Sequence, residues 1–159
     1  MDNERIWARS LEVMDENFGH VSEISLGSTA DGEVVVRDVH SYYIDGKMYI
    51  LSKANNVLMH HISKCPNVGM SHGAHKMQGV ARSLGHPLDP ANADLRKKLK
   101  REFSLNYDEY VTEANPDMRI VEIALTKAQT FTRHHRYNID FVNKLAERDH
   151  TEPLFVYRH

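Results

Sequence analysis

The chain has 159 residues, of which 41% are hydrophobic and 26% are charged, with 20 basic and 22 acidic side chains. This composition is typical of a globular protein, so we expect residues 1–159 to form a single domain. The formal net charge of -2 gives no reason to expect nucleic acid or an anionic membrane as a partner. No apolar run approaches the roughly 20 residues that a membrane span needs.

The cysteine content and the first residues both favour the cytoplasm. Cys65 is the only cysteine, so the chain cannot form an internal disulfide, which fits a reducing compartment. The sequence starts Met-Asp-Asn-Glu-Arg, without the basic region and apolar segment of a secretory signal. We therefore expect a cytoplasmic protein, with Cys65 as a packed residue rather than a catalytic thiol.

The first predicted elements are a helix over residues 3–18 and a strand over residues 21–26. The apolar residues of the helix recur at helical intervals: Ile6, Trp7, Leu11, Met14 and Phe18. Gly19 follows as a suitable C-terminal stop. Residues 27–32 have the composition of a turn, so we expect them to end the strand.

A β-hairpin is predicted over the next segment. Residues 33–40 are rich in β-branched side chains, as strands are. Asp45 and Gly46 then separate the short runs 41–44 and 47–51. This pair is a strong hairpin signal, because aspartate and glycine tolerate the positive φ angles that a two-residue turn demands.

The second predicted helix begins near Asn55 or Asn56 and ends before Pro66, with Val57, Leu58 and Ile62 on its apolar side. A strand end, a polar loop and a helix start are suited to an anion, because the first N–H groups of a helix are unpaired. Arg37 and Lys53 would add positive charge. The residues alone therefore predict a phosphate-bearing ligand on a β-sheet. The alternative is an ordinary hairpin and helix with two solvated charges.

Two short strands are predicted next, over residues 67–72 and 75–83, with a turn at Gly73 between them. From Ala91 the pattern becomes helical, because Leu95, Leu99 and Phe103 are four residues apart. The basic residues of this helix are interrupted by acidic ones and lack an aromatic ladder. They therefore indicate a solvated face and not a nucleic-acid site.

The last third of the chain is predicted to contain a short helix over residues 107–112 and a long strand over residues 118–132. The length of this strand indicates a bend or bulge. A short helix is expected over residues 141–146, and the apolar segment 154–157 is expected to dock on its own subunit or on a partner. Five to seven strands with flanking helices indicate an α+β domain built on an antiparallel barrel.

Several features in a fixed order resemble the pyridoxamine 5'-phosphate oxidase-like flavoproteins: Arg37 followed by Val39, the Asp45-Gly46 hairpin, Ser52 with Asn56, and a helix closed by Pro66 before Asn67-Val68. Gly79, followed by Val80 and Ala81, matches a glycine in a later barrel strand of that family. The agreement extends from about residue 21 to residue 131. Beyond Arg133, over an extension of about residues 133–159, the resemblance is to a subgroup of uncharacterised members.

This resemblance implies an antiparallel split β-barrel with flanking helices, which forms a homodimer and binds FMN between its two subunits. The cofactor-binding residues that it implies are Arg37, Val39, Ser52, Lys53, Asn56 and Gln78. Arg37 matches a strand arginine that reaches the flavin or its phosphate, Ser52 matches a residue that hydrogen-bonds the phosphate region, and Asn56 matches a polar residue at the helix start.

The sequence departs from the family at Leu58, where many members have a phosphate-binding lysine. We infer that Lys53 supplies the missing charge. The resemblance implies no metal ligand, and the sequence assigns no catalytic residue. His72, His75 and Gln78 are candidates to contact a substrate on the exposed face of the flavin.

The expected function is therefore FMN-dependent oxidoreduction of a small molecule, with a nicotinamide nucleotide as electron donor. Two alternatives stay open. A haem or metal site is suggested by the pairs His60-His61, His72/His75 and His134-His135, because imidazole is a good ligand. The second alternative is a non-enzymatic flavin-binding or stress-related protein of the same fold, because a fold does not fix a function.

Overall fold

The computed structural model describes residues 2–102 and 113–152. Its helices are α1 (Asp2–Phe18), α2 (Val57–Lys64) and α3 (Ala93–Glu102), with a short 3-10 helix η1 (Pro90–Asn92) before α3. Its strands are β1 (Ser22–Ala30), β2 (Glu33–Ile44), β3 (Lys47–Lys53), β4 (Asn67–His72), β5 (His75–Gly85), β6 (Met118–Phe131), β7 (His135–Asp140) and β8 (Leu145–His150).

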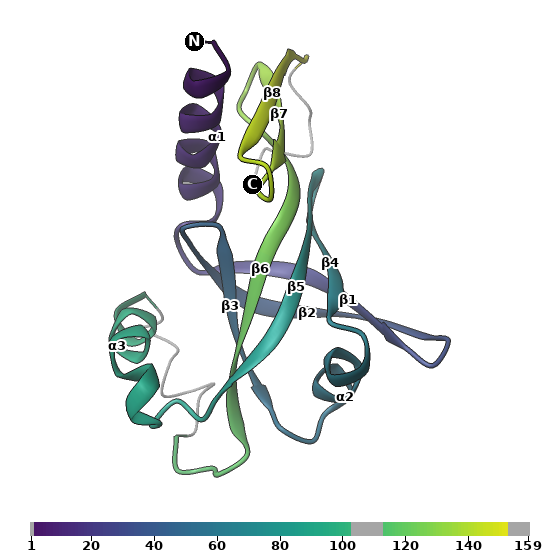
Figure 1. Cartoon of the computed structure of the whole chain (residues 1–159), viewed down its shortest axis with the longest axis vertical. Helices are drawn as coiled ribbons and strands as arrows, with labels where there is room; N and C mark the ends of the chain where they lie inside the picture. The colour runs from purple at the N-terminus through teal and green to yellow at the C-terminus, as the bar shows by residue number, and fades with distance from the viewer. Residues whose placement is uncertain (1, 103–112, 153–159) are drawn as a thin grey trace.

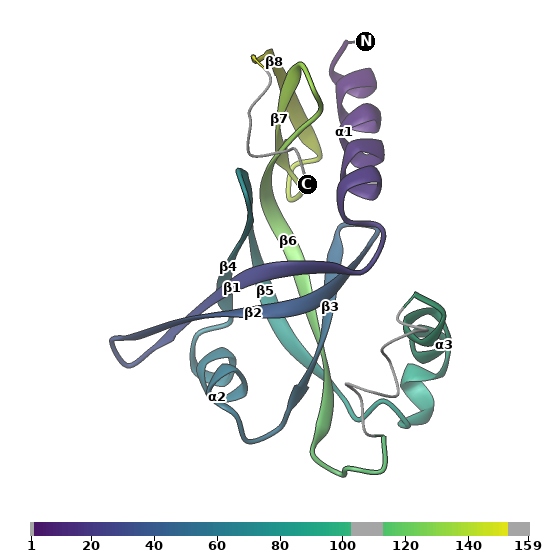
Figure 2. The same cartoon turned by 180° about the vertical axis from the view of Figure 1, so that it is seen from behind.

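The first six strands close into a barrel. Their order in the sheet is β3-β2-β1-β4-β5-β6, and β3 also pairs with β6, so the ends of the sheet meet. Every pairing is antiparallel. The predicted α+β antiparallel barrel with flanking helices is thus confirmed. Figures 1 and 2 show the barrel strands crossing in the lower half of the molecule, with β7 and β8 above them.

Strand β6 belongs both to the barrel and to the extension formed with β7 and β8. Its first residues pair with β3 and its last residues pair with β7. The pairing with β5 shifts between Gln78 and Gly79, because Thr126 is an extra residue on β6 at this point. This irregularity confirms the bend or bulge that the length of the strand predicts, and it lets β6 turn from the barrel into the β7–β8 extension.

Gly79 lies at this bulge for a steric reason. A Cβ atom on it would lie 2.6 Å from the side chain of Ile123 and 2.7 Å from the backbone oxygen of Ala124. Only a residue without a side chain allows β5 and β6 to approach so closely. The packing therefore explains why a glycine stands in this strand.

Turn chemistry fixes the two N-terminal hairpins. Asp45 and Gly46 have φ angles of 46° and 82°, as the predicted two-residue turn requires. The turn predicted over residues 27–32 is wrong in extent, because β1 continues to Ala30 and only Asp31 and Gly32 lie outside the strands. The small polar residues that precede this turn pair with residues of β2 in the β1–β2 ladder. Figure 2 shows the resulting β1–β2 ribbon projecting from the barrel.

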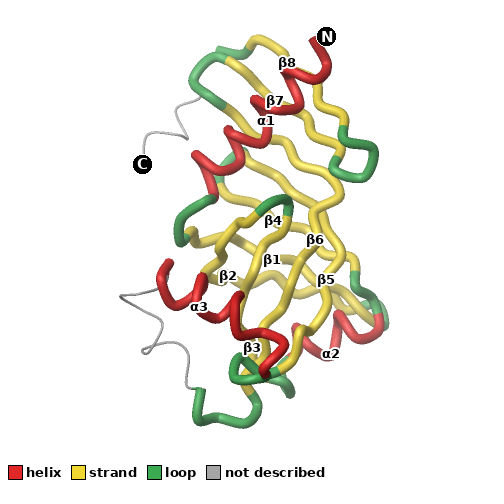
Figure 3. Tube along the Cα trace, turned by 60° about the vertical axis from the view of Figure 1, so that its left-hand side comes forward, coloured by secondary structure: helices red, strands yellow, loops and turns green. Residues whose placement is uncertain are grey.

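The core fills the barrel and continues under the first helix. Leu26, Met48 and Ile123 are fully buried inside the barrel, and Met14 and Phe18 of α1 join the same cluster. Figure 3 shows α1 lying across β7 and β8. Helix α2 packs on β1, and α3 covers a second cluster through the fully buried Leu99. The helix predicted for residues 3–18 is confirmed.

The helix predicted for residues 141–146 is wrong. Residues 141–144 form a turn between β7 and β8, and Lys144 has a positive φ of 55°. The carboxylate of Asp140 accepts the N–H groups of Val142 and Asn143, both at 3.0 Å, so a side chain closes the turn in place of helical hydrogen bonds. The helix predicted over residues 107–112 and the apolar segment 154–157 lie outside the described residues.

Among the residues that the structure describes, none of the helices combines the length and the apolar character that crossing a membrane requires.

Candidate functional site

A pocket of about 470 Å³ lies where β2, β3 and the start of α2 meet. Its lining residues are Val35, Arg37, Val39, Leu51, Ser52, Lys53, Asn56, Val57, Leu58 and Met118. We call it the Arg37 pocket. Five of the six cofactor-binding residues predicted from the sequence line it, and Gln78 does not. Its walls are largely apolar, and a few polar groups converge in it, as in sites for small organic ligands.

Arg37 is the half-buried cation of this pocket. It stands opposite Leu26 in the β1–β2 ladder. Its Nη1 donates to the backbone oxygen of Leu26 at 3.2 Å and to Oγ of Ser28 at 2.7 Å. Its Nη2 is buried and has no hydrogen-bond partner within the described chain. Burial lowers the pKa of Arg37, but a guanidinium keeps its charge at neutral pH.

An unpartnered buried N–H of a cation is costly, because the group has lost water and gained nothing in exchange. In a native protein such a group calls for an explanation, and a ligand is one. The acceptor that would satisfy Nη2 best is an anion. The Arg37 pocket therefore has the chemistry of an anion site on its arginine side.

The opposite side of the pocket is built by the start of α2. Asn56 is the N-cap, and its Oδ1 accepts the backbone N–H of Met59 at 3.0 Å. Its Nδ2 donates to Oγ of Ser52 at 2.6 Å. This capping fixes where the helix begins and leaves the hydroxyl proton of Ser52 available to a ligand. The predicted helix start at Asn55 or Asn56 is confirmed.

Three further donors lie at this edge. The N–H groups of Val57 and Leu58 are in the first turn of α2, where a helix offers no carbonyl partner of its own. The exposed Lys53 ends β3 just before the helix and makes no ion pair among residues 2–102 and 113–152. Together with the helix dipole, these groups favour negative charge in the pocket.

Leu58 is where the sequence departs from the family pattern. Its side chain is 5% exposed and belongs to the barrel core, while it also lines the pocket. It supplies an apolar wall and no charge. The charged groups in the lining are Arg37 and Lys53.

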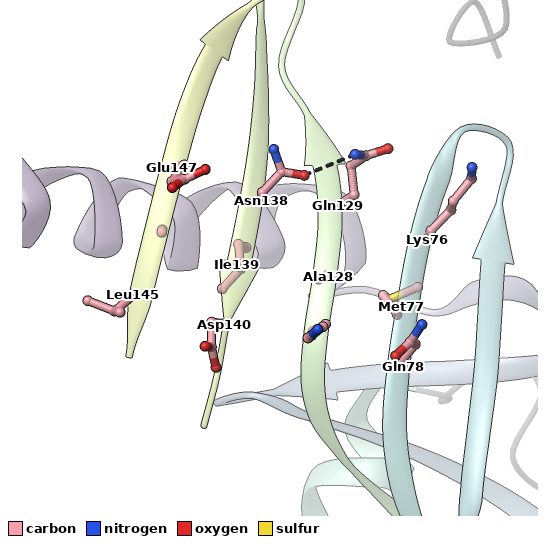
Figure 4. Close-up of a pocket in the computed structure, with 12 residues that line it drawn as sticks. Lys76, Met77, Gln78, Ala128, Gln129, Asn138, Ile139, Asp140, Leu145 and Glu147 are labelled. Atoms are coloured by element: carbon pink, nitrogen blue, oxygen red, sulfur yellow. Dashed lines mark hydrogen bonds between the residues drawn. The ribbon is translucent and has the colours of Figure 1, made fainter. Parts of the chain in front are cut away.

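Gln78 lines a different hollow, which we call the outer depression. It has a volume of about 420 Å³ and lies on the face of β5, β6, β7 and β8 that is opposite to α1 (Figure 4). Lys76, Gln129, Asn138 and Glu147 stand side by side across these strands. Gln129 donates to Asn138 at 2.9 Å. Within one chain, Gln78 is therefore not brought together with the Arg37 pocket.

The structure places His75 in the core instead of on a ligand-accessible face. It is 7% exposed, its Nδ1 lies 2.8 Å from Oγ1 of Thr130, and Phe18 and Phe131 pack edge-on against its ring. Burial lowers the pKa of His75 to about 4, helped by the neighbouring His72, so its imidazole is neutral at neutral pH. His75 is therefore not a substrate contact in this chain.

His72 is exposed, and its Nδ1–H donates to the backbone oxygen of Glu23 at 2.8 Å. The rings of His134, His135 and His150 gather at one end of the β7–β8 hairpin, with centroids about 6 Å apart. In the part of the chain that the structure describes, no three histidine, cysteine, aspartate or glutamate side chains are grouped to hold a metal ion. Cys65 is half-buried at the end of α2.

Sequence reasoning did not connect Ser28, Glu33 or His61 with Arg37, and it considered His61 only as part of a candidate haem or metal pair. Ser28 lies between Arg37 and His61, and His61 contacts Glu33 through its other ring nitrogen. One signal was present, because a histidine at position 61 shares the apolar face of α2 with Leu58 and Ile62. A polar residue on such a face calls for a hydrogen-bond partner.

Comparison with known proteins gives matches in structure alone. No protein-family model and no curated protein sequence matches the chain. An FAD-binding protein of Mesorhizobium loti superposes with a TM-score of 0.56 and 17% identity, over 75% of this chain and 91% of that one. ChuZ of Campylobacter jejuni has a TM-score of 0.64 and 14% identity, over 91% of this chain but 62% of ChuZ.

A third similar structure is a Clostridium acetobutylicum protein of the pyridoxinephosphate oxidase family, related to general stress protein 26. It has a TM-score of 0.55 and 11% identity, over 89% of this chain and 99% of that one. The chain has the split-barrel fold of these proteins. The resemblance seen in the sequence is thus confirmed for the fold. In this split barrel, the Arg37 pocket lies beside the β3–β6 pairing that closes the sheet.

Proposed function

We propose that this split-barrel protein binds FMN, with the phosphate in the Arg37 pocket, and that it is an oxidoreductase acting on a small molecule. The observation that carries the proposal is Arg37, which lines the pocket and whose buried Nη2 has no partner within the described chain. A phosphate oxygen is the acceptor that this nitrogen lacks. The FAD-binding protein of the same fold adds support for a flavin.

The donors of the pocket fit a phosphate. Arg37 would donate Nη2 to one oxygen, Ser52 would donate its hydroxyl proton, and the N–H groups of Val57 and Leu58 would donate from the start of α2. Lys53 would add a mobile charge at the rim. The apolar side chains of Val35, Val39, Leu51 and Met118 would exclude water from these contacts.

FMN supplies the redox chemistry when it is bound, through reversible transfer of electrons at its ring. The role of the described residues is to hold the phosphate and to keep the polar contacts dry. Arg37 would also stabilise negative charge beside the cofactor, since its cation is fixed in a place of low polarity. We propose a reduced nicotinamide nucleotide as electron donor, which a stopped-flow assay of anaerobic flavin reduction would detect.

The test is a titration of the purified protein with FMN and, in parallel, with riboflavin, which lacks the phosphate. We expect FMN to bind at least about tenfold more tightly, because the contacts proposed are with the phosphate. The visible spectrum of the complex should bleach with dithionite. Equal affinity for both flavins would contradict the phosphate site, and a Soret band in the purified protein would favour haem in its place.

We also propose that the protein is a homodimer. Val34 and Val36 are 72% and 66% exposed and lie on the face of β2 opposite to Arg37. Exposed apolar side chains next to each other on a strand favour a partner surface. Light scattering should give twice the mass of one chain, and Val36→Asp should reduce it to that of a single chain. A wild-type protein with the mass of one chain would contradict this proposal.

A further inference from the structure

We propose that Glu33, His61 and Ser28 form a hydrogen-bonded relay that positions the Arg37 guanidinium for an anion in the Arg37 pocket. The inference rests on the proposed function, in which that anion is the phosphate of FMN. The three residues come from two strands and a helix, and none of them lines the pocket. They are therefore positioning residues, which act through Arg37.

The relay is continuous in space. Nη1 of Arg37 lies 2.7 Å from Oγ of Ser28, and the same Oγ lies 2.7 Å from Nδ1 of His61. Nε2 of His61 then lies 2.8 Å from Oε1 of Glu33. Ser28 and His61 are 2% and 1% exposed, so water does not compete for the bond between them. The Glu33 side chain is 62% exposed, so the relay begins at the surface and ends inside the protein.

For a neutral His61, the chemistry of the groups sets the direction of the bonds. A guanidinium has only donors, so Oγ of Ser28 accepts from Arg37. The proton of Ser28 then points to Nδ1 of His61, which accepts it. The other ring nitrogen, Nε2, carries the hydrogen and donates to the carboxylate of Glu33. One neutral tautomer of His61, protonated on Nε2, therefore satisfies every bond.

The relay also ties the two sides of the site together. His61 belongs to α2, whose first turn forms one edge of the Arg37 pocket, and Arg37 belongs to β2 on the other edge. Through Ser28 of β1, the relay links the helix to the guanidinium. The N–H groups of α2 and the cation are thus kept in one relative position before a ligand arrives, which lowers the ordering cost of binding.

A purely structural arginine would satisfy both of its terminal nitrogens. Here the relay and the Leu26 carbonyl engage Nη1, while Nη2 has no partner within the described chain. Holding one nitrogen fixes the plane of the guanidinium and hence the direction of the other. A buried polar network costs stability relative to apolar packing, so its presence behind a binding group favours a positioning role.

The first test uses the ligand-free protein. A long-range 15N–1H correlation spectrum of the imidazole groups should show His61 as the neutral tautomer with hydrogen on Nε2. The Arg37 Nε–H signal should shift in Ser28→Ala and stay in place in Ser41→Ala. Ser41 is a matched control, because it is a fully buried strand serine with a single backbone acceptor, the Ser22 oxygen at 3.2 Å. Hydrogen on Nδ1 of His61, or an unmoved Arg37 signal in Ser28→Ala, would overturn the relay.

The second test measures binding. Ser28→Ala should raise the Kd for FMN about tenfold and leave the Kd for riboflavin unchanged, because the relay acts on the phosphate through Arg37. In the Arg37→Ala background, Ser28→Ala should have no further effect. Equal additional losses in both backgrounds would overturn the relay. A wild-type protein that binds no FMN would instead contradict the proposed function, and the ligand-free spectra would then decide the relay alone.

Discussion

The Arg37 pocket and the outer depression differ little in volume, about 470 and 420 Å³, but they differ in how their polar groups are paired. In the outer depression, polar side chains stand on an open sheet face, where water or a neighbour such as Asn138 satisfies them. In the Arg37 pocket, a half-buried cation has one buried nitrogen without a partner in the described part of the chain. The two hollows are therefore distinguished by an unpartnered buried donor and not by their size.

The largest effect is expected from removing that charge. Arg37→Ala should weaken FMN binding about ten- to a hundredfold, because a charge-assisted hydrogen bond is worth about 1.5–3 kcal/mol. Lys98→Ala, at an exposed position on α3, is the control and should leave the affinity unchanged. Fluorescence quenching of FMN measures both. Equal affinity of the two variants would remove Arg37 from the site and end the distinction between the two hollows.

The next effect concerns stability at the bulge beneath the outer depression. Gly79→Ala should cost about 1–3 kcal/mol in the free energy of unfolding, because the new Cβ would overlap Ile123 and the Ala124 backbone. Gly69→Ala is the control on the adjacent strand, since its Cβ would have no atom within 4 Å. Urea denaturation compares the two. A Gly79 variant as stable as the Gly69 variant would contradict the close approach of β5 and β6.

A smaller effect is expected from His75, whose pKa is lowered by burial from 6.5 to about 4. Between these values the unfolded chain binds a proton that the folded protein does not, so stability is full above pH 6.5 and falls as the pH drops toward 4. His75→Gln should flatten this part of the curve, and the same change at the exposed His60 should not. Unfolding free energies measured across this pH range test the prediction. An unchanged slope in the His75→Gln variant would contradict a buried neutral His75.

The smallest effect is expected from Gln78→Ala. Because Gln78 faces the outer depression of its own chain, its loss should change the FMN affinity less than about threefold. The titration used for Arg37→Ala measures it. A loss as large as that of Arg37→Ala would mean that the outer depression of a second copy completes the site.

Local chemistry explains which parts of the fold could be predicted. The Asp45-Gly46 turn and the Asn56 cap depend on neighbouring residues, and both are found where the sequence places them. The helix expected over residues 141–146 failed because Asp140 closes a turn with its side chain. An apolar pattern of six residues cannot reveal such a competing hydrogen bond.

For the same reason, only the part of the site that depends on neighbouring residues was predictable. Ser52, Lys53 and Asn56 are close in sequence, so one strand end and one helix start bring them together. Ser28 and His61 meet across 33 residues, and their contact depends on how α2 packs on β1. Periodicity places a histidine on the apolar face of the helix, but it does not give the partner.

The pairing of β3 with β6 has a consequence for the order of folding. It joins residues 47–53 to residues 118–124, so this seam closes one of the longest loops of the chain. Contacts of such sequence separation form slowly, on the scale of milliseconds to seconds in β-rich proteins. Ser52 and Met118 lie on the two sides of the seam, and both line the Arg37 pocket. The pocket therefore exists only after the seam has closed, and quenching of FMN fluorescence during refolding should report that late event.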